Sequence, residues 1–134
     1  MKPQGAGFVL YRKLNGTWHV LVLVDNKGKF DFPKGHVDAG DMGPFATAQR
    51  ECFEETGIFV KKDDLLCKDS RTSGPLTMFC ASTSQDPSIG INPVTGNKEH
   101  IGCFWAKPES AVRLMPKYLK KVLSWSIALP VFDT

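Results

Sequence analysis

The fold is decided by residues 44–57, which read Pro-Phe-Ala-Thr-Ala-Gln-Arg-Glu-Cys-Phe-Glu-Glu-Thr-Gly. Pro44 suits the first position of a helix, where its missing N–H costs nothing, and Gly57 suits the carboxyl-terminal cap. Apolar side chains recur between them at helical spacing, at Phe45, Ala48, Cys52 and Phe53. The pattern predicts a helix with an apolar face, which the strands on either side of it in the sequence would cover.

Segments with the character of β-strands flank this helix on both sides. The runs at 7–12 and 18–24 are rich in β-branched and aromatic residues, and Asn15-Gly16 lies between them. Because both residues tolerate positive φ, this pair predicts a hairpin. Further strands are expected at 29–32, 58–61, 74–81 and 101–106, and further helices from Pro108 and Pro116. This order predicts an α+β protein, an α/β/α sandwich around a mixed β-sheet, with a single domain over residues 1–134.

Two segments have the composition of loops. Residues 34–43 contain Gly35, Gly40 and Gly43, and we expect them to form a glycine-rich loop across the polar face of the helix, where it could hold a phosphate chain. Residues 82–97 are rich in Ser, Gly, Pro and Asn and are long for a loop in a compact domain. This second segment is therefore either a mobile functional loop or disordered.

Three acidic side chains share the polar face of the predicted helix. Glu51, Glu54 and Glu55, at positions i, i+3 and i+4, fall within a sector of roughly 100°. An acidic stripe facing solvent is the ordinary explanation of such a pattern. Here the like charges repel, and all three lie near the negative end of the helix dipole, so the arrangement destabilises the helix. Clustered carboxylates that are costly without a cation indicate a site for a divalent metal ion, with Mg²⁺ the first candidate.

Composition excludes several classes of protein. The chain has 134 residues, of which 42% are hydrophobic and 23% charged, and no apolar stretch approaches the ~20 residues of a membrane-spanning helix. The net charge of +3 does not indicate a stable nucleic-acid partner. The four cysteines are widely spaced, without a C-x-x-C pair, and the N-terminus has no signal-peptide pattern. These features predict free thiols and a cytoplasmic location, with no membrane partner.

The stretch from Gly35 to Ile58 resembles the Nudix box, G-x5-E-x7-R-E-U-x-E-E-x-G-U, in which U is a bulky apolar residue. The half that begins at Arg50 matches the box at every specified position. The other half departs from it twice: Asp41 stands where the family has Glu, and one extra residue separates Asp41 from Arg50. A variant of this kind also resembles Nudix enzymes encoded by some bacteriophages. The resemblance implies the Nudix sandwich fold for the whole chain.

The resemblance also implies how a metal ion would be held. Glu51 and Glu55 would be direct ligands of Mg²⁺, with Mn²⁺ as the expected substitute. Glu54 would be a third ligand or would bind through water, oriented by Arg50. In the family, the carbonyl just before the box glycine often completes the metal shell, and here that carbonyl belongs to Lys34.

The implied reaction is hydrolysis of a diphosphate linkage in a nucleoside diphosphate joined to another group. A carboxylate takes a proton from the attacking water. Glu54 is one candidate for this base. Glu99 is the other, because it begins the strand after the long loop, where several relatives carry a further catalytic or metal-binding glutamate. With Arg50, these two glutamates form the predicted catalytic set.

Within the family, residues 32–38 resemble the P-K-G-H-V-E segment of diadenosine tetraphosphate hydrolases, and Glu99-His100 resembles their E-H segment. We therefore expect Gly35, His36 and His100 to bind substrate, which would be a small nucleotide. Those enzymes use a lysine for phosphate and tyrosines to sandwich adenine, and neither residue type occurs at 74–79 or 101–105. Phe79 and Phe104 are expected to stack on the base instead.

Three alternatives to a dinucleoside polyphosphate remain open. The same chemistry could act on ADP-ribose, FAD or another nucleotide conjugate, or on the triphosphate end of RNA. A Nudix module that senses nucleotides without turnover is less favoured, because Glu51, Glu54 and Glu55 are all present. The sequence leaves the oligomeric state open.

Overall fold

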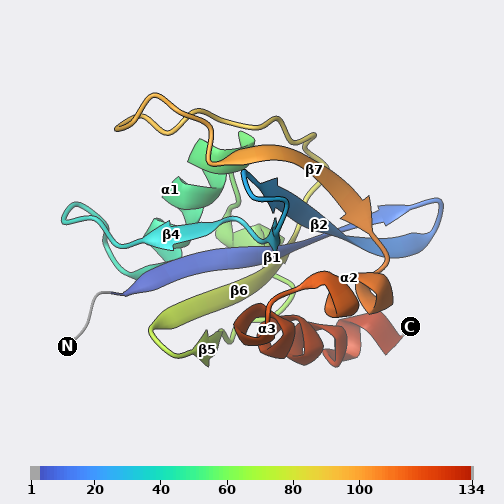
Figure 1. The fold of residues 1–134 in the computed structure, drawn as a ribbon. Helices are drawn as coiled ribbons and strands as arrows, with labels where there is room; N and C mark the ends of the chain where they lie inside the picture. Colours follow the sequence, from blue (N-terminus) through green and yellow to red (C-terminus); the bar gives the residue numbers. More distant parts are fainter. Residues whose placement is uncertain (1–3, 134) are drawn as a thin grey trace.

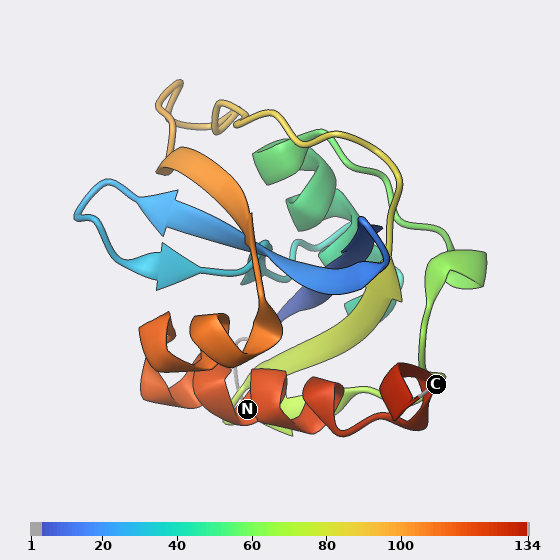
Figure 2. The same ribbon diagram turned by 90° about the vertical axis from the view of Figure 1, so that its right-hand side faces the viewer.

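The structure, a computed structural model, describes residues 4–133. In this part of the chain a sheet of seven strands lies between helices (Figures 1 and 2). The strands are β1 (Gly5–Leu14), β2 (Thr17–Asp25), β3 (Phe30–Asp31), β4 (Lys34–His36), β5 (Arg71–Ser73), β6 (Leu76–Ser82) and β7 (His100–Ala106). The helices are α1 (Pro44–Thr56), α2 (Pro108–Leu114) and α3 (Lys117–Ile127), with short 3₁₀ turns at Lys62–Asp64 and Pro130–Asp133.

The sheet is mixed. Its strands follow the order β3-β2-β1-β6-β5, and β4 pairs with β1 while β7 pairs with β2. Strands β1 and β6 run parallel, with Phe8 opposite Phe79, and the other pairs are antiparallel. Because a long connection that includes β3, β4, α1 and β5 joins the first hairpin to β6, strands β1 and β6 can run side by side in the same direction.

Each face of the sheet has its own apolar core, because side chains alternate along β1 and β2. On one face, Phe8 and Leu21 pack with Cys52 of α1. On the other, Val9 and Val20 pack with the buried side chains of α3. Figure 2 shows α1 on one side of the sheet and α2 and α3 on the other. The predicted α/β/α sandwich is confirmed.

The first hairpin forms as predicted. Asn15 and Gly16 adopt φ values of 52° and 79°, the double positive φ that a two-residue turn needs to match the twist of its strands. The register places Leu14 opposite Thr17 and Tyr11 opposite Val20. The strands extend beyond the predicted ends, which brings Gly5 and Gly7 of β1 beside β4.

Helix α1 has the predicted bounds, and its predicted apolar face is confirmed at Phe45, Ala48 and Cys52 but not at Phe53. Gly57 caps it at φ 74°, donating its N–H to the carbonyl of Phe53 at 2.8 Å. The prediction that Phe53 faces the core is wrong: its side chain is 55% exposed and contacts Phe59 edge-on. The core positions instead include Thr47 and Thr56. Thr56 can be buried because its hydroxyl donates to the carbonyl of Cys52 at 2.7 Å.

The strand predicted at 58–61 is wrong. Ile58 and Val60 are buried, as an alternating pattern requires, but no neighbouring strand pairs with this segment in the described chain. Glutamine side chains bond to its backbone instead. Gln49 donates to the carbonyl of Val60 at 2.8 Å, and Gln85 bonds both the N–H and the carbonyl of Phe59. The alternating pattern agrees with the burial of Ile58 and Val60. A local pattern cannot show whether a partner strand lies beside the segment.

The segment predicted as a glycine-rich loop begins with a strand. Residues 34–36 form β4, which pairs antiparallel with β1 so that Gly5 lies opposite His36 and Gly7 opposite Lys34. A side chain at Gly7 would collide with Pro33 and Lys34, so the glycines of β1 allow β4 to approach closely. Only the remainder, 37–43, is the loop that leads into α1.

The long segment before β7 packs against α1. Ser88 donates its backbone N–H to the carbonyl of Thr56 at 2.8 Å, and Gly90 donates to that of Glu55 at 3.0 Å. These bonds satisfy carbonyls that the end of a helix leaves without partners. Figure 1 shows the segment, yellow to orange, crossing the end of α1 before β7 begins. The sequence left a mobile functional loop or disorder open, and the structure shows the segment hydrogen-bonded to the end of α1.

Two further expectations concern the chain as a whole. In residues 4–133, no helix is long and apolar enough to cross a membrane. All four cysteines are free, as predicted; Cys52 and Cys80 are buried, while Cys67 and Cys103 are half-buried.

Candidate active site

Four glutamates converge at the end of α1. Glu51, Glu54 and Glu55 of the helix line one depression with Glu99, which lies just before β7 and is brought there by the preceding loop. The other residues that line it are Gly90, Asn92 and His100. Asn92 donates a hydrogen bond from its side-chain amide to the carboxylate of Glu99. The fold therefore brings together the acidic residues that the sequence singled out, including the one farthest away.

The backbone of Gly35 lies directly against the carboxylate of Glu51. A Cβ placed at Gly35 would overlap the carboxyl carbon and both carboxylate oxygens of Glu51. Beside it, the backbone N–H of Lys34 donates to Oε1 of Glu55 at 3.2 Å. The box glycine is thus required for the close approach of a side chain to the backbone of β4 rather than for a turn.

Arg50 connects the loop to the acidic face of the helix. Its Nε and Nη2 donate to the two carboxylate oxygens of Asp41, each at 3.0 Å, which is a bidentate pair. Its Nη1 lies 3.0 Å from Oε2 of Glu51 and 3.5 Å from the carboxylate of Glu54. Its Nη2 also donates to the carbonyl of His36 at 2.8 Å. Arg50 therefore contacts Glu51 and Glu54, whereas the resemblance implied such a contact only for Glu54.

Asp41, the residue that departs from the box, is the anchor of Arg50. Its side chain is 7% exposed and also accepts hydrogen bonds from the Thr47 hydroxyl at 2.7 Å and the Asp38 N–H at 2.9 Å. The hydrogen bonds from Arg50 hold the pKa of Asp41 well below its usual range. A shorter carboxylate thus makes the arginine contact despite the extra residue in the loop.

Replacing Asp41 with Asn is expected to destabilise the protein by about 2 kcal/mol, the usual contribution of a hydrogen bond to a charged group. One oxygen and the negative charge opposite Arg50 would be lost. Urea unfolding of wild type and D41N measures the difference. Asp38→Asn is the matched control, because the Asp38 side chain is 67% exposed and lies 3.4 Å from the same arginine. Equal stability of D41N and wild type would contradict the anchoring role.

Arg50 compensates the carboxylates of α1 only in part. Burial raises the pKa of Glu55 to about 9 and also raises that of Glu51, whose side chain is 16% exposed. Neighbouring acids add to both shifts: Glu51 and Asp31 act on Glu55, and Glu54 and Glu99 on Glu51. Two buried, mutually repelling carboxylates are unfavourable unless a cation or protons neutralise them.

The residues of this depression suit a divalent cation of the Mg²⁺ type. Such ions prefer hard carboxylate oxygens, and the depression offers four carboxylates, of which those of Glu51 and Glu55 are largely buried. Among residues 4–133, no three His, Cys, Asp or Glu side chains already stand at metal-binding spacing. The ligand set of Glu51, Glu54, Glu55 and the Lys34 carbonyl remains a prediction.

Without a metal ion, the protein is expected to lose stability as the pH rises from about 5 to about 9. Burial raises the pKa of Glu55 from its ordinary value of 4.5 to about 9 in the folded protein. Between these values the folded state holds a proton that the unfolded state has lost, so raising the pH favours unfolding. Thermal melts in EDTA across this range test the trend. Added Mg²⁺ should flatten it, and a profile in EDTA that rises with pH would contradict it.

A cavity of about 380 Å³ borders the other side of β4. It is lined by Lys34, Gly35 and His36 of β4 together with Gly5, Ser73, Gly74, Pro75, Leu76 and Tyr118. Its size is within the range of small-ligand pockets. Tyr118 of α3 is 45% exposed, and its ring centroid lies 5.8 Å from Nζ of Lys34. An exposed aromatic ring and an ammonium group therefore meet beside the box glycine.

The two predicted histidines have different surroundings. His36 is exposed at the edge of the cavity. His100 is 4% exposed, and its Nε2 lies 3.1 Å from Oδ2 of Asp31. His100 lines the glutamate depression, so the structure places one histidine on each side of β4.

Phe79 and Phe104 are not brought together. Phe79 packs against Phe8 and Phe45 on the face of the sheet that α1 covers. Phe104 is opposite Val22 and contacts Phe30, which packs against the other core. The two rings therefore lie on opposite faces of the sheet and cannot enclose one base, because neighbouring positions of a strand point to opposite sides.

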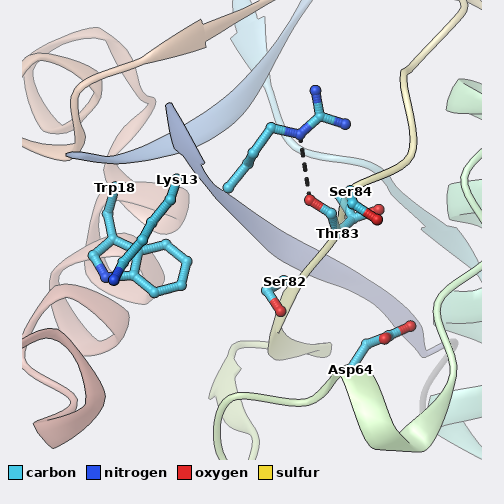
Figure 3. Close-up of a pocket in the computed structure, with 7 residues that line it drawn as sticks. Lys13, Trp18, Asp64, Ser82, Thr83 and Ser84 are labelled. Atoms are coloured by element: carbon cyan, nitrogen blue, oxygen red, sulfur yellow. Dashed lines mark hydrogen bonds between the residues drawn. The ribbon is translucent and has the colours of Figure 1, made fainter. Parts of the chain in front are cut away.

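A separate depression lies at the far end of β1, away from β4. It is lined by Arg12, Lys13, Trp18, Asp64, Ser82, Thr83 and Ser84. Figure 3 shows Ser82, Thr83 and Ser84 along one side, and the Nε of Arg12 donates to the carbonyl of Thr83 at 3.3 Å. The same guanidinium lies 3.0 Å from Asp86. Arg12 thus holds the start of the loop that crosses α1, which is a structural role.

Comparison with known proteins agrees with this geometry. A sequence model of the NUDIX domain matches residues 1–126. The chain belongs to the Nudix family. The Nudix domain and its hydrolase neighbours support hydrolysis of pyrophosphate bonds as the reaction class, and Nudix proteins in general use divalent metal ions. The resemblance drawn from the box is confirmed.

One curated relative of this Nudix protein is viral. A stretch of 60 residues is 37% identical to protein 111R of Invertebrate iridescent virus 3. The stretch makes up 45% of this chain and only 28% of the viral protein. The match therefore covers about a quarter of that protein's length.

Solved structures resemble the Nudix protein over nearly its whole length. An Ap4A hydrolase of C. elegans, solved as a binary complex, has a TM-score of 0.70 and 23% identity over 95% of this chain and 96% of its own. The NUDIX domain of Shewanella oneidensis NrtR, complexed with ADP ribose, has a TM-score of 0.64 and 17% identity over 96% and 91%. At these identities the comparisons show a shared fold.

Several residues of the site have roles that the sequence alone did not suggest. Asp31 pairs with His100, Asn92 bonds to Glu99, and Tyr118 borders the β4 cavity. Of these residues, only Tyr118 had an indication in the sequence, as an aromatic residue among the lysines of the last helix. The other two are ordinary polar residues of a strand and a loop, and only the pairing of distant segments reveals them.

Proposed function

We propose that this Nudix protein is a Mg²⁺-dependent pyrophosphohydrolase of dinucleoside polyphosphates such as diadenosine tetraphosphate. The observation that carries the proposal is the position of β4 between two features. The glutamate depression adjoins Gly35 and the backbone of Lys34, and the cavity bordered by Tyr118 is lined by the same residues. A base in the cavity would place its phosphate chain across β4, toward the carboxylates. The C. elegans structural neighbour is an Ap4A hydrolase, which supports this substrate class.

In this proposal the chain's own residues have separate tasks. Glu51, Glu55 and the Lys34 carbonyl would hold the metal ion, with Glu54 as a further ligand. When bound, the ion would supply neutralisation of phosphate charge and a lower pKa for bound water. Arg50 keeps Glu51 and Glu54 in position through its contact with Asp41.

Two carboxylates are the candidates to accept the proton of the attacking water. Glu54 is on the helix, within reach of Arg50, and Glu99 is on the opposite wall, where Asn92 holds it. The lysine ammonium of Lys34 and the exposed His36 would bind phosphate, and Tyr118 would stack on the base. In this arrangement Tyr118 takes the part expected of Phe79 and Phe104.

The experiment that tests the function measures Mg²⁺-dependent hydrolysis of a substrate panel. The panel contains diadenosine polyphosphates, ADP-ribose, FAD and 5′-triphosphate RNA, and it compares wild type with Glu54→Gln and Glu99→Gln. Preference for a diadenosine polyphosphate is the expected result, and preference for another member would assign the substrate to that class. Inactivity of the wild type on the whole panel would favour a nucleotide-sensing module. A glutamate whose Gln variant is as active as wild type is not the base.

Replacing Tyr118 with Ala is expected to raise KM for diadenosine tetraphosphate about tenfold, with a smaller effect on kcat. Stacking of a base on an aromatic ring contributes about 1–3 kcal/mol, and the ring is remote from the carboxylates. Steady-state kinetics measure the change. Tyr118→Phe is the matched control and should keep the wild-type KM, because it keeps the stacking face. An unchanged KM in Y118A would place the base elsewhere.

Two predictions about the whole protein stay proposals. The first is a single Nudix domain over residues 1–134. The second is a cytoplasmic location, which the free cysteines support because thiols stay reduced there.

A further inference from the structure

Asp31 lies between two cationic or ionisable side chains from different strands. Its Oδ1 is 3.2 Å from Nζ of Lys34, and its Oδ2 is 3.1 Å from Nε2 of His100. The backbone N–H of Phe32 also donates to Oδ1 at 2.9 Å. The Asp31 carboxylate therefore has three partners, and through Lys34 and His100 it links β4 to the start of β7.

Lys34 has a second group of anions close by. Its own backbone N–H donates to Glu55, so its side chain begins beside the carboxylate depression. An ammonium group attracts carboxylates as a metal ion does, and Lys34 has a long, flexible stem. An ammonium that moved from Asp31 to Glu55 would partly neutralise the charge that attracts a divalent cation.

The observed geometry prevents this pairing. Nζ of Lys34 lies against Asp31 and over the ring of Tyr118, which directs it to the cavity side of β4. Its side chain is 21% exposed and that of Asp31 19% exposed, so the pair is partly shielded from water. Buried His100 fixes the other oxygen of Asp31, which keeps the carboxylate from rotating toward solvent.

We propose that Asp31 is a positioning residue that holds the Lys34 ammonium away from Glu51 and Glu55 and at the edge of the Tyr118 cavity. There the ammonium meets the phosphate chain of a nucleotide. The metal ligands stay available to the cation, so metal and substrate do not compete for one lysine. The substrate part of this inference rests on the proposed function, whereas the metal part does not.

The test is a double-mutant cycle of Asp31→Asn and Lys34→Gln, read as the affinity for Mn²⁺ alone by calorimetry at fixed pH. Asp31→Asn is expected to weaken Mn²⁺ binding about tenfold, because the released ammonium moves onto the metal ligands. Lys34→Gln should change it less than about twofold in wild type but restore most of the lost affinity in D31N. Additive effects of the two substitutions would overturn the proposal.

Lys29→Gln is the matched control, since it removes an exposed lysine from the turn before β3. It should not restore Mn²⁺ affinity to D31N; restoration would show an effect of net charge alone. Circular dichroism checks that each variant folds. If D31N does not fold, Lys34→Gln alone still decides: a change in Mn²⁺ affinity of about tenfold or more would show that the ammonium already acts on the metal ligands.

Binding of ADP in EDTA tests the substrate side without turnover. Both Asp31→Asn and Lys34→Gln should weaken ADP binding several-fold, because each removes the ammonium from the cavity edge. ADP binding by D31N as tight as wild type would overturn this part. Since neither readout requires hydrolysis, a wild type that cleaves no diadenosine polyphosphate would refute the proposed function and leave the Mn²⁺ cycle to be judged separately.

Discussion

Replacing Glu55 with Gln is expected to lower hydrolysis by Mg²⁺-loaded protein at least about 100-fold. Loss even of the groups that orient metal ligands lowers activity or affinity by about 10–100-fold, and Glu55 is predicted to be a ligand itself. Gln keeps the size of the side chain and can still accept the hydrogen bond from the Lys34 N–H. The loss would therefore report the missing charge rather than a distorted helix.

The same substitution is expected to stabilise the metal-free protein at alkaline pH. Burial raises the pKa of Glu55 to about 9, so above that pH the wild type must hold a buried charge that Gln never carries. Thermal melts in EDTA should show E55Q above wild type at pH 9 and close to it at pH 5. A fall in both activity and alkaline stability would indicate a structural role instead.

Glu109→Gln is the matched control for Glu55→Gln. Glu109 is an exposed glutamate of α2 and does not line the glutamate depression. Its substitution should leave both hydrolysis and the pH profile of stability unchanged. Wild-type activity in E55Q would remove Glu55 from the predicted metal ligands.

Replacing Gly35 with Ala is expected to be nearly as damaging to activity. The added methyl group would occupy the position of the Glu51 carboxylate, so that carboxylate must move or β4 must separate from α1. Overpacking of this kind costs about 1–3 kcal/mol of stability. Displacement of a predicted metal ligand should lower Mn²⁺ affinity and hydrolysis by about 100-fold, measured by calorimetry and steady-state kinetics.

Gly40→Ala separates this effect from a general effect of losing a glycine. Gly40 lies in the loop after β4, has no heavy atom within 4 Å of a built Cβ and does not need positive φ. It should retain wild-type activity and Mn²⁺ affinity. Wild-type Mn²⁺ affinity in Gly35→Ala would show that Glu51 does not need its observed position to bind metal.

The features that the sequence predicted correctly depend on neighbouring residues. The turn at Asn15-Gly16 and the cap at Gly57 follow from the φ values that these residues tolerate. The shared face of Glu51, Glu54 and Glu55 follows from helical periodicity. The box half from Arg50 to Ile58 identified the family, because all its specified residues lie on this helix and its cap.

The errors concern contacts between segments distant in the chain. Segment 58–61 has the alternation of a strand but no partner strand within residues 4–133. Phe53 is exposed, whereas Thr47, Ala48, Cys52 and Thr56 are the buried positions of α1. Phe79 and Phe104 were paired by residue type, yet the registers of β6 and β7 place them on opposite faces. In each case burial and pairing depend on what the rest of the chain brings near.

The sequence by itself determined the family, the acidic helix face and the reaction class, because a helix places residues three and four apart on one face whatever surrounds it. Only the tertiary structure decided that β4 is a strand with the Glu51 carboxylate seated on Gly35. It also placed Tyr118 beside Lys34 and Asp31 between Lys34 and His100. Those contacts depend on strand register and helix docking, which involve residues up to 84 positions apart (Lys34 and Tyr118) and have no signature in local sequence.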